Sequence, residues 1–347
     1  MREKIRVLVI DDSAFMRKMI TDILSSDHRI TVIGTARNGE IGLRKMKELQ
    51  PDVITLDVEM PVMDGLSTLK EIMNNHPIPV VMISGTSNQH MKKTIQAISN
   101  GAIDFVAKPS GTISVDIKRI EQEIISKVIT ASQVDMNVIT KQKKFTSSKL
   151  TSFNQKETLI CIGTSTGGPK ALETILKSIP KELQASILIV QHMPEQFTKS
   201  FAQRLNQIAH IPVKEARHHE QIKEGHAYVA PGNYHMLVQK KGKDLKIVLS
   251  KEEKQKGHRP SVDVLLQSVS QLNECQKIAI ILTGMGKDGA KGVVELKKAD
   301  KHSLVITESE QTALIYGMPS AAKETGHVNY TLPVHQISEL LVDILIK

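Results

Sequence analysis

The sequence contains no tryptophan, and aromatic residues make up only 3% of its 347 positions. Aromatic side chains supply the surfaces on which the bases of single-stranded nucleic acids stack, so their scarcity argues against that class of partner. The net charge of +9 does not reverse this conclusion. The excess of lysine and arginine is spread along the chain and is not gathered on one helix. We therefore expect no nucleic-acid partner.

Cysteines and long apolar runs are also scarce. The two cysteines, Cys161 and Cys275, lack the spacing of metal ligands and predict free thiols in a reducing cytoplasm. No apolar run approaches the roughly 18 residues needed to span a bilayer, and the first residues form a strand pattern unlike a signal peptide. We expect a cytoplasmic protein with no membrane insertion.

The length of the chain and a change of pattern near its middle predict two domains. In residues 1–125, strand-like apolar runs alternate with helical patterns, which predicts a doubly wound, parallel five-stranded α/β sheet. The predicted strands are residues 6–10, 30–36, 53–56, 80–83 and 104–107. Residues 126–156 predict a linker, because most of this segment is rich in serine, threonine, glutamine and lysine and has no apolar period.

Residues 157–347 resume the alternation and predict a second doubly wound α/β domain. Its buried strands are predicted at residues 159–162, 187–190, 278–282 and 304–307. Three further runs, at 228–230, 236–239 and 245–249, predict an antiparallel insertion. The last two of these runs flank a lysine-rich turn at 240–244 and predict a hairpin.

Polar side chains follow four strands of the first domain. Asp11 and Asp12 follow the first strand, Asp57 the third, Ser84 the fourth and Lys108 the fifth. Because the carboxyl ends of parallel strands meet at one edge of a sheet, these side chains should converge. Three carboxylates suit Mg²⁺, one of them could attack a phosphoryl group, and the lysine would offset the product's charge. A single acid of this kind could be merely a helix cap, but five such positions together argue against that reading.

The first domain resembles the receiver domain of response regulators, which implies a flavodoxin-like fold. The resemblance rests on Val-Ile-Asp-Asp-Ser at 9–13, Leu-Asp-Val-Glu-Met-Pro at 56–61, Met-Asp-Gly at 63–65, Ser-Gly at 84–85 and Lys-Pro at 108–109. It implies that Asp57 is the phosphoacceptor. It also implies that Asp11, Asp12 and Asp57 hold Mg²⁺ together with the backbone carbonyl of Glu59.

The same resemblance assigns a switch. It implies that Lys108 contacts the phosphoryl group and that Ser84 and Phe105 occupy the switch positions. Phosphorylation adds charge that a hydroxyl and a lysine can reach, and so it can bias a loop with two arrangements. A chemotaxis histidine kinase is the implied phosphodonor.

A serine lies on a glycine-rich turn at the start of the second domain. The segment Gly-Thr-Ser-Thr-Gly-Gly at 163–168 follows an apolar strand and precedes a helical pattern. Such a turn lifts Ser165 to the end of the sheet, beside the N–H groups of the helix start. A phosphate-binding loop is the alternative, but the glycine spacing does not match the dinucleotide motif G-x-G-x-x-G.

Two further side chains complete a set that can activate this serine. His192 follows the next buried strand, and Asp288 follows the strand predicted at 278–282. A hydroxyl, an imidazole and a carboxylate at neighbouring strand ends form a nucleophile, a base and an orienting group. The chain order differs from that of α/β-hydrolases. We favour Asp288 as the orienting carboxylate because glycines flank it. Asp263 remains an alternative. Five other histidines lie on predicted loops or strand ends: 218, 219, 226, 235 and 258.

The second domain resembles the chemotaxis protein-glutamate methylesterase family. The matching segments are Ile-Gly-Thr-Ser-Thr-Gly-Gly-Pro at 162–169, Gln-His-Met-Pro at 191–194, Val-Ala-Pro-Gly-Asn at 229–233, His-Arg-Pro-Ser-Val-Asp at 258–263 and Leu-Thr-Gly-Met-Gly-Lys-Asp-Gly at 282–289. The resemblance implies that Ser165 is the nucleophile, His192 the base and then the acid, and Asp288 its orienting carboxylate. The implied reaction removes methyl esters from glutamates, and deamidates glutamines, on methyl-accepting chemotaxis receptors, with no cofactor at the hydrolase site.

Further expectations concern substrate and control. The N–H of Thr166 is a candidate oxyanion donor, and Arg259 contacts substrate carboxylates or forms a structural salt bridge. We expect the unphosphorylated receiver to cover the serine. A DNA-binding output domain is a weaker hypothesis, because the second domain is long and rich in strands. A signalling scaffold with an idle pocket is the alternative from another class.

Overall fold

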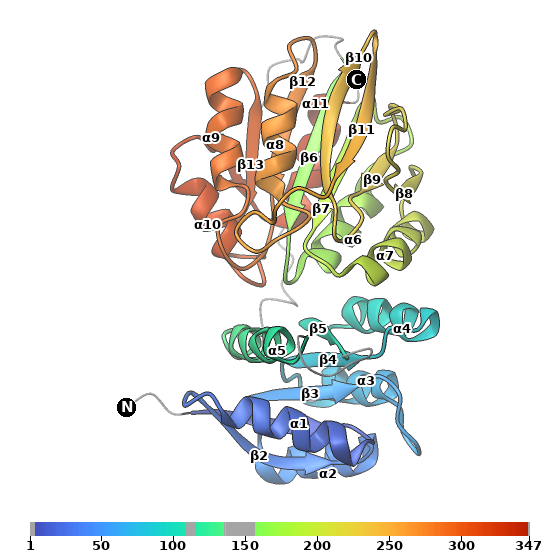
Figure 1. Cartoon of the computed structure of the whole chain (residues 1–347), viewed down its shortest axis with the longest axis vertical. Helices are drawn as coiled ribbons and strands as arrows, with labels where there is room; N and C mark the ends of the chain where they lie inside the picture. Colours follow the sequence, from blue (N-terminus) through green and yellow to red (C-terminus); the bar gives the residue numbers. More distant parts are fainter. Residues whose placement is uncertain (1–3, 109–115, 135, 137–156, 346–347) are drawn as a thin grey trace. The chain divides into compact units, whose positions relative to one another are not determined.

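A computed structural model describes residues 4–108, 116–134, 136 and 157–345 of the chain. The chain divides into two compact units, residues 1–137 and 138–347. Each unit is built on its own sheet (Figure 1). None of the helices in the described ranges is long and apolar enough to cross a membrane.

The first unit alternates five strands with five helices. The elements are β1 Ile5–Ile10, α1 Ala14–Ser25, β2 Ile30–Ala36, α2 Gly39–Leu49, β3 Val53–Asp57, α3 Gly65–Asn75, β4 Val80–Ser84, α4 Asn88–Ser99, β5 Asp104–Ala107 and α5 Asp116–Ser132. The strands run parallel in the order β2-β1-β3-β4-β5. The predicted receiver-like sheet is therefore confirmed.

Polar residues at the strand-to-helix turns start four of these helices. The side chains of Ser13, Asn38, Asp64 and Ser87 each accept a hydrogen bond from the backbone N–H three residues later. These bonds satisfy donors that a helix start leaves free. Each turn is thereby held at the carboxyl edge of the sheet, where the predicted acidic cluster lies.

The helix α5 crosses the boundary that we expected at residue 125. It runs to Ser132, seven residues into the predicted linker. The reason is that its buried face continues: Ile124, Val128 and Ala131 are all buried. Apolar side chains at this helical spacing keep the segment packed on its domain. The remainder of the predicted linker lies almost wholly outside the described residues.

The second unit is a larger sheet with a separate hairpin. Its elements are β6 Thr158–Thr164, α6 Gly168–Ser178, β7 Ser186–Gln191, α7 Glu195–Ile208, β8 Val213–Glu215, β9 Ala227–Val229, β10 His235–Lys241, β11 Asp244–Ser250, α8 Val262–Ser270, β12 Gln276–Ile281, α9 Ala290–Ala299, β13 Leu304–Glu308, α10 Gly317–Lys323, β14 Tyr330–Leu332 and α11 Val334–Leu345. Seven parallel strands follow the order β14-β13-β12-β6-β7-β9-β8.

The antiparallel insertion is smaller than the sequence predicts. Among the strands described in this unit, β10 and β11 alone pair antiparallel, closing through a turn in which Gly242 has φ +66°. The run at 228–230, predicted as part of the insertion, is instead β9, which pairs parallel with β7. Its three residues are buried on both faces, as in a parallel sheet, so they gave no alternating signal. The hairpin and α8 are neighbours, and their buried residues belong to one hydrophobic cluster. Figure 1 shows the course of both hairpin strands.

The strand order reverses at β6. The chain passes from β6 to β7 on one side, and it later returns to β12 on the other side of β6. A reversal of this kind leaves a crevice beyond the carboxyl ends of the strands, because the crossing connections diverge there. The turns after β6, β7 and β12 therefore converge on one place.

Candidate functional site

The predicted serine and histidine lie at adjacent strand ends. Thr164 pairs with Gln191 in the last register position of β6 and β7. One residue later, the N–H of His192 donates to the carbonyl of Thr164 at 3.0 Å. The N–H of Ser165 donates to the carbonyl of Thr283, which follows β12, also at 3.0 Å. The three turns are thus joined by backbone hydrogen bonds around the serine.

The serine turn is crowded, and glycines make it feasible. Gly167 has φ +81°, a left-handed conformation that favours glycine, and α6 begins at the next residue. A Cβ on Gly168 would lie 2.2 Å from Oε1 of Gln191. A Cβ on Gly284 would lie 2.8 Å from the Cβ of Ser165. The close packing around these glycines places a half-buried serine directly before a helix N-terminus.

His192 is oriented by a buried carboxylate. Its Nε2 lies 2.8 Å from Oδ2 of Asp288, and the two side chains are 7% and 1% exposed. Its Nδ1 is buried and has no hydrogen-bond partner among the described residues. With the proton on Nε2 donated to Asp288, Nδ1 is the basic nitrogen. Ser165 is not hydrogen-bonded to it in this structure; such bonds often form only when substrate binds.

Asp288 is held by four hydrogen bonds. Besides His192, the donors are the hydroxyl of Ser261 at 2.8 Å and the backbone N–H groups of Val262 at 2.7 Å and Asp263 at 3.1 Å. These last two donors belong to the start of α8. Burial alone would raise the pKa of Asp288, but these donors hold it well below its usual range. The carboxylate is thus a persistent negative charge beside the histidine.

Asp263, the alternative acid, has different partners. Its Oδ1 accepts the backbone N–H groups of Gly289 and Gly292, both at 2.8 Å, at the start of α9. Its Oδ2 accepts the ammonium of Lys256 at 2.9 Å. Asp263 therefore caps α9, and the structure pairs His192 with Asp288 instead.

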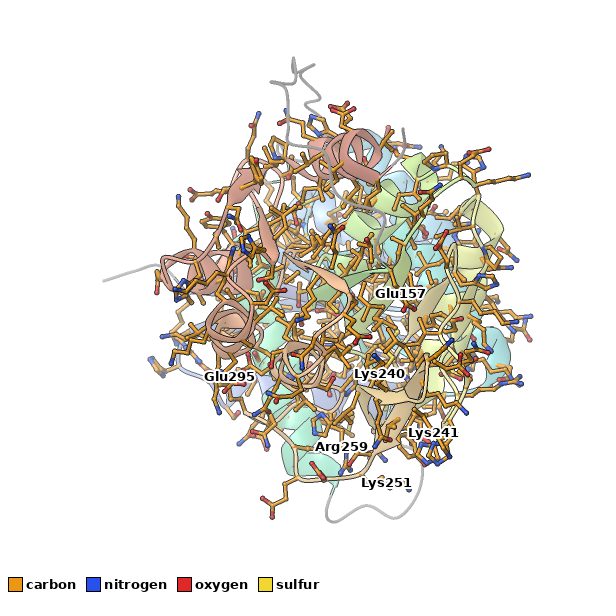
Figure 2. All side chains as sticks on the ribbon, turned by 90° about the horizontal axis from the view of Figure 1, so that it is seen from above. Glu157, Lys240, Lys241, Lys251, Arg259 and Glu295 are labelled. Atoms are coloured by element: carbon orange, nitrogen blue, oxygen red, sulfur yellow. The ribbon has the colours of Figure 1, made fainter. Side chains whose placement is uncertain are left out.

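Arg259 forms no salt bridge with any residue in the described ranges. Its guanidinium donates to the carbonyls of Lys251 and Glu252 and to Oδ1 of Asn233. These bonds fasten the segment after the hairpin, and Arg259 and Lys251 lie close together in Figure 2. The Nε of Arg259 is buried without a partner among the described residues. Thr166, the candidate oxyanion donor, accepts the hydroxyl of Thr283 at 2.9 Å through its carbonyl.

Sequence reasoning missed a glutamine that links the predicted nucleophile and the predicted base. The Nε2 of Gln191 donates to the carbonyls of Ser165 at 2.9 Å and His192 at 3.1 Å. Its side chain lies under the serine turn, where Gly168 leaves room for it. The only signal in the sequence was a polar residue ending an otherwise apolar strand.

A buried glutamate near the site was also missed. Glu308 ends β13 and accepts the N–H of Thr283 at 2.8 Å and the hydroxyl of Thr312 at 2.9 Å. Burial raises the pKa of Glu308 to about 7, and its two hydrogen bonds act in the opposite direction. Because Thr283 in turn accepts the N–H of Ser165, Glu308 supports the serine through one intermediate residue.

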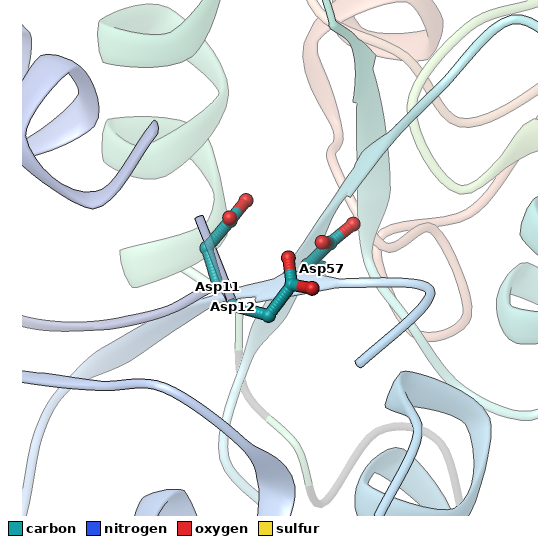
Figure 3. Close-up of side chains that lie close together, drawn as sticks. All are labelled: Asp11, Asp12 and Asp57. Atoms are coloured by element: carbon teal, nitrogen blue, oxygen red, sulfur yellow. The ribbon is translucent and has the colours of Figure 1, made fainter. Parts of the chain in front are cut away.

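The acidic cluster of the first unit forms as predicted. Asp11, Asp12 and Asp57 offer carboxylate oxygens that all lie within 4.8 Å of one another (Figure 3). Lys108 approaches two of them, with its Nζ 2.9 Å from Asp11 and 2.8 Å from Asp57. Glu59 turns its carboxylate away, toward α4, where His90 and Lys93 bind it.

Burial shapes the charges of this cluster. It raises the pKa of Asp57 to about 6, although the hydrogen bond from Lys108 lowers it. Burial alone would lower the pKa of Lys108, but its two carboxylate partners raise it. The cluster therefore holds more negative than positive charge in little space, an arrangement that favours a cation with oxygen ligands.

The two predicted switch residues are both held by helices. The hydroxyl of Thr94, on α4, donates to the Ser84 hydroxyl at 2.5 Å, and Ser84 donates to the carbonyl of Gly85. Phe105 is 4% exposed, and the ammonium of Lys127, on α5, lies 5.0 Å from the centre of its ring. Ser84 is thus occupied by Thr94 in this structure.

Comparisons with known proteins match each unit to a known family. The family described as CheB methylesterase matches residues 160–341, and the response regulator receiver domain matches residues 7–121. The chain belongs to the CheB methylesterase family. A relative from Oceanobacillus iheyensis is 50% identical over 98% of both chains, and one from Bacillus subtilis is 42% identical over 96% of both. Both relatives are named protein-glutamate methylesterase/protein-glutamine glutaminase.

A solved structure supports the fold of the second unit. The CheB methylesterase catalytic domain of Thermotoga maritima is 39% identical, with a TM-score of 0.52. The match covers 54% of this chain and 98% of that one. The second unit of the present chain therefore corresponds to an entire catalytic domain of the family.

The two acids should respond differently to the same substitution. Asp288→Asn replaces an acceptor oxygen with a donor and should lower the turnover of an ester substrate about 10⁴-fold. Asp263→Asn weakens the cap of α9, and we expect it to cost about 1 kcal/mol of stability and less than tenfold in turnover. Turnover and thermal unfolding of both variants check this. The assignment is wrong if Asp263→Asn is the inactive variant and Asp288→Asn is active.

Glu308 should make the stability of the second unit depend on pH. Its pKa rises from 4.5 when exposed to about 7 in the fold. The folded state thus binds the proton more tightly, so this stabilisation is complete below about pH 4.5 and is lost as the pH rises through 7. Glu308→Gln mimics the protonated acid. In this variant the free energy of unfolding should no longer show the decrease, on the order of 3 kcal/mol, that ionisation of Glu308 causes in the wild type as the pH rises. Denaturant unfolding at a series of pH values measures it.

The control for that experiment is Glu310→Gln, which changes an exposed glutamate two residues away. This variant should follow the wild-type pH dependence. An unchanged pH dependence in Glu308→Gln would show that the buried carboxyl does not take up the proton.

Proposed function

We propose that the protein is a phosphorylation-activated serine hydrolase that removes methyl esters from glutamates on methyl-accepting chemotaxis receptors. It also deamidates specific glutamines there, because an amide presents the same carbonyl to the nucleophile. The observation that carries this proposal is the arrangement of His192 at the strand end beside Ser165. The Nε2 of His192 binds Asp288, and its Nδ1 has no hydrogen-bond partner in the part of the chain that the structure describes. Membership of the CheB family supports the choice of substrate.

The reaction uses two proton transfers through His192. Oγ of Ser165 attacks the γ-carbonyl carbon of the ester while Nδ1 of His192 takes the hydroxyl proton. The tetrahedral intermediate collapses, and His192 gives that proton to the departing oxygen, which leaves as methanol. Water then attacks the acyl-enzyme while His192 takes one of its protons. His192 returns this proton to Oγ of Ser165 as the acyl bond breaks, which releases glutamate and free serine. With glutamine, the first leaving group is ammonia.

Two features of the site lower the barrier to these steps. Asp288 stays ionised and bound to Nε2, so it stabilises the imidazolium that forms in each transition state. The developing oxyanion lies beside the start of α6, where the N–H of Thr166 is the candidate donor. The Thr283 hydroxyl fixes the carbonyl of this residue and so holds its peptide in place.

The first unit supplies the control. Asp57 accepts a phosphoryl group from a chemotaxis histidine kinase, with Lys108 next to it to offset the added charge. Asp11, Asp12, Asp57 and the carbonyl of Glu59 would hold Mg²⁺, and the all-oxygen cluster fits this ion. Bound Mg²⁺ would neutralise charge on the phosphoryl oxygens.

Phosphorylation would change the switch and free the hydrolase. The Ser84 hydroxyl would leave Thr94 for the phosphoryl oxygens, and Phe105 would respond through the adjacent strand. In the unphosphorylated protein the receiver restrains the hydrolase. Cys161 and Cys275 are free thiols, the usual state in a reducing cytoplasm, where we place the protein.

Replacement of the nucleophile tests the hydrolase proposal directly. Ser165→Ala should reduce methanol release from methylated receptors by about 10⁶-fold, to background. Ser178→Ala, an exposed serine at the far end of α6, is the matched control and should retain activity. Equal methanol release from wild type and Ser165→Ala would exclude the serine mechanism. An inactive wild type would favour a signalling scaffold.

Removal of the receiver tests the control. A chain that lacks residues 1–137 should release methanol faster than the full chain by roughly 5- to 150-fold, the range of ordinary allosteric coupling. A small phosphodonor should accelerate the full chain, but neither the truncated chain nor Asp57→Asn. Unchanged basal activity after truncation would contradict inhibition by the receiver.

A further inference from the structure

A second histidine packs on the face of His192. The rings of His192 and His258 lie parallel, with 4.0 Å between their centres and 4° between their planes. His258 lies between β11 and α8, in the motif that also contains Ser261 and Asp263. His258 is not part of the Ser165, His192 and Asp288 set, and it takes no part in the proposed reaction steps.

The segment that carries His258 is fastened at several points. His258 and Gln255 exchange two backbone hydrogen bonds, at 2.9 and 3.1 Å. The next residue, Arg259, donates to the carbonyls of Lys251 and Glu252 and to Asn233. A ring on so restrained a backbone can act as a fixed surface for its neighbour.

The hydrogen bond of His192 does not by itself fix the tilt of its ring. Its Nε2 is bound to Asp288 and its Nδ1 is free, but a single edge contact does not stop the ring from tilting. The parallel ring of His258 covers one face and restricts that tilt. Small errors in the position of a catalytic group are costly, reaching about 10²-fold for a shift near 1 Å.

We propose that His258 is a positioning residue for the hydrolase reaction, whose ring holds the face of His192 so that Nδ1 stays free to take the serine proton. This inference rests on the proposed function of Ser165 and His192. Replacement of the His258 ring should therefore change turnover and leave substrate binding unchanged.

The charge of His258 suits this task. Burial, and then the neighbouring His192, lower the pKa of His258 to about 4; Lys254 and Lys256 act in the same direction, and Asp288 opposes them. His258 is therefore neutral near pH 7. A neutral ring can stay stacked on His192 when that side chain becomes an imidazolium, whereas a charged one would repel it.

Three variants of the full-length protein separate the ring from its nitrogens. His258→Phe keeps an aromatic face, whereas His258→Ala and His258→Gln remove it. With methylated receptors as substrate, we expect the Phe variant to stay within about threefold of the wild-type kcat. The Ala and Gln variants should lose roughly 10- to 100-fold in kcat, with KM within about twofold of wild type.

The control is His219→Ala. The ring of His219 packs on His218, with centres 3.7 Å apart, so it matches the change without touching His192. This control should keep wild-type kcat. Thermal unfolding of every variant separates lost positioning from lost folding. Recovery of kcat by Phe at equal stability is an outcome that a purely structural role does not predict.

Labelling of Ser165 by a fluorophosphonate probe gives a second readout that does not depend on the substrate. Its rate should fall in His258→Ala and recover in His258→Phe. Wild-type labelling and kcat in His258→Ala, or a Phe variant as impaired as Ala, would overturn the inference. If wild type and Ser165→Ala release methanol equally, the proposed function fails instead, and the labelling rates still decide the role of His258.

Discussion

The active-site geometry depends on two buried carboxylates that each cap the helix of the other. Asp288, just before α9, accepts the first N–H groups of α8, and Asp263, in the first turn of α8, accepts N–H groups at the start of α9. A buried carboxylate needs such donors, because without them its desolvation would be prohibitive. The positive ends of both helices stabilise the two charges further. The exchange locks α8 and α9 together and leaves one free position on Asp288, which His192 fills.

The same exchange explains why the hydrolase site is at this reversal of the sheet. The turn after β12 must bring Asp288 to α8 and also present Thr283 to the N–H of Ser165. Two glycines make this possible. Gly284 lets the turn pack closely against Ser165, and Gly289 has φ +97°, a left-handed conformation that favours glycine. Thus the carboxylate, the histidine and the serine are positioned by one set of packed turns, with Gln191 joining two of them from below.

The sequence was sufficient for the long buried strands and for the residues at their ends, because buried parallel strands are continuous apolar runs and their ends share one edge. It missed the short edge strands β8 and β14, whose three residues are too few to give a periodic signal. The flanking glycines favoured Asp288 but could not exclude Asp263, because each is a carboxylate beside a helix start and only the partner differs. Gln191, Glu308 and His258 were not identified as parts of the site. Their importance comes from contacts between segments distant in sequence, which no local period reveals.

The pKa values of the buried carboxylates in the two units are shifted in opposite directions, and the difference follows from their donors. Asp57 receives hydrogen bonds from Lys108 and the N–H of Val58, shares its space with Asp11, and has its pKa raised to about 6 by burial. Asp288 accepts four hydrogen bonds, and its pKa is lowered despite comparable burial. A nucleophilic carboxylate must keep an oxygen available for phosphorus, so its site cannot saturate it with donors. An orienting carboxylate never leaves its partners, so saturation with donors is an advantage. The number of donors agrees with the two roles proposed for Asp57 and Asp288.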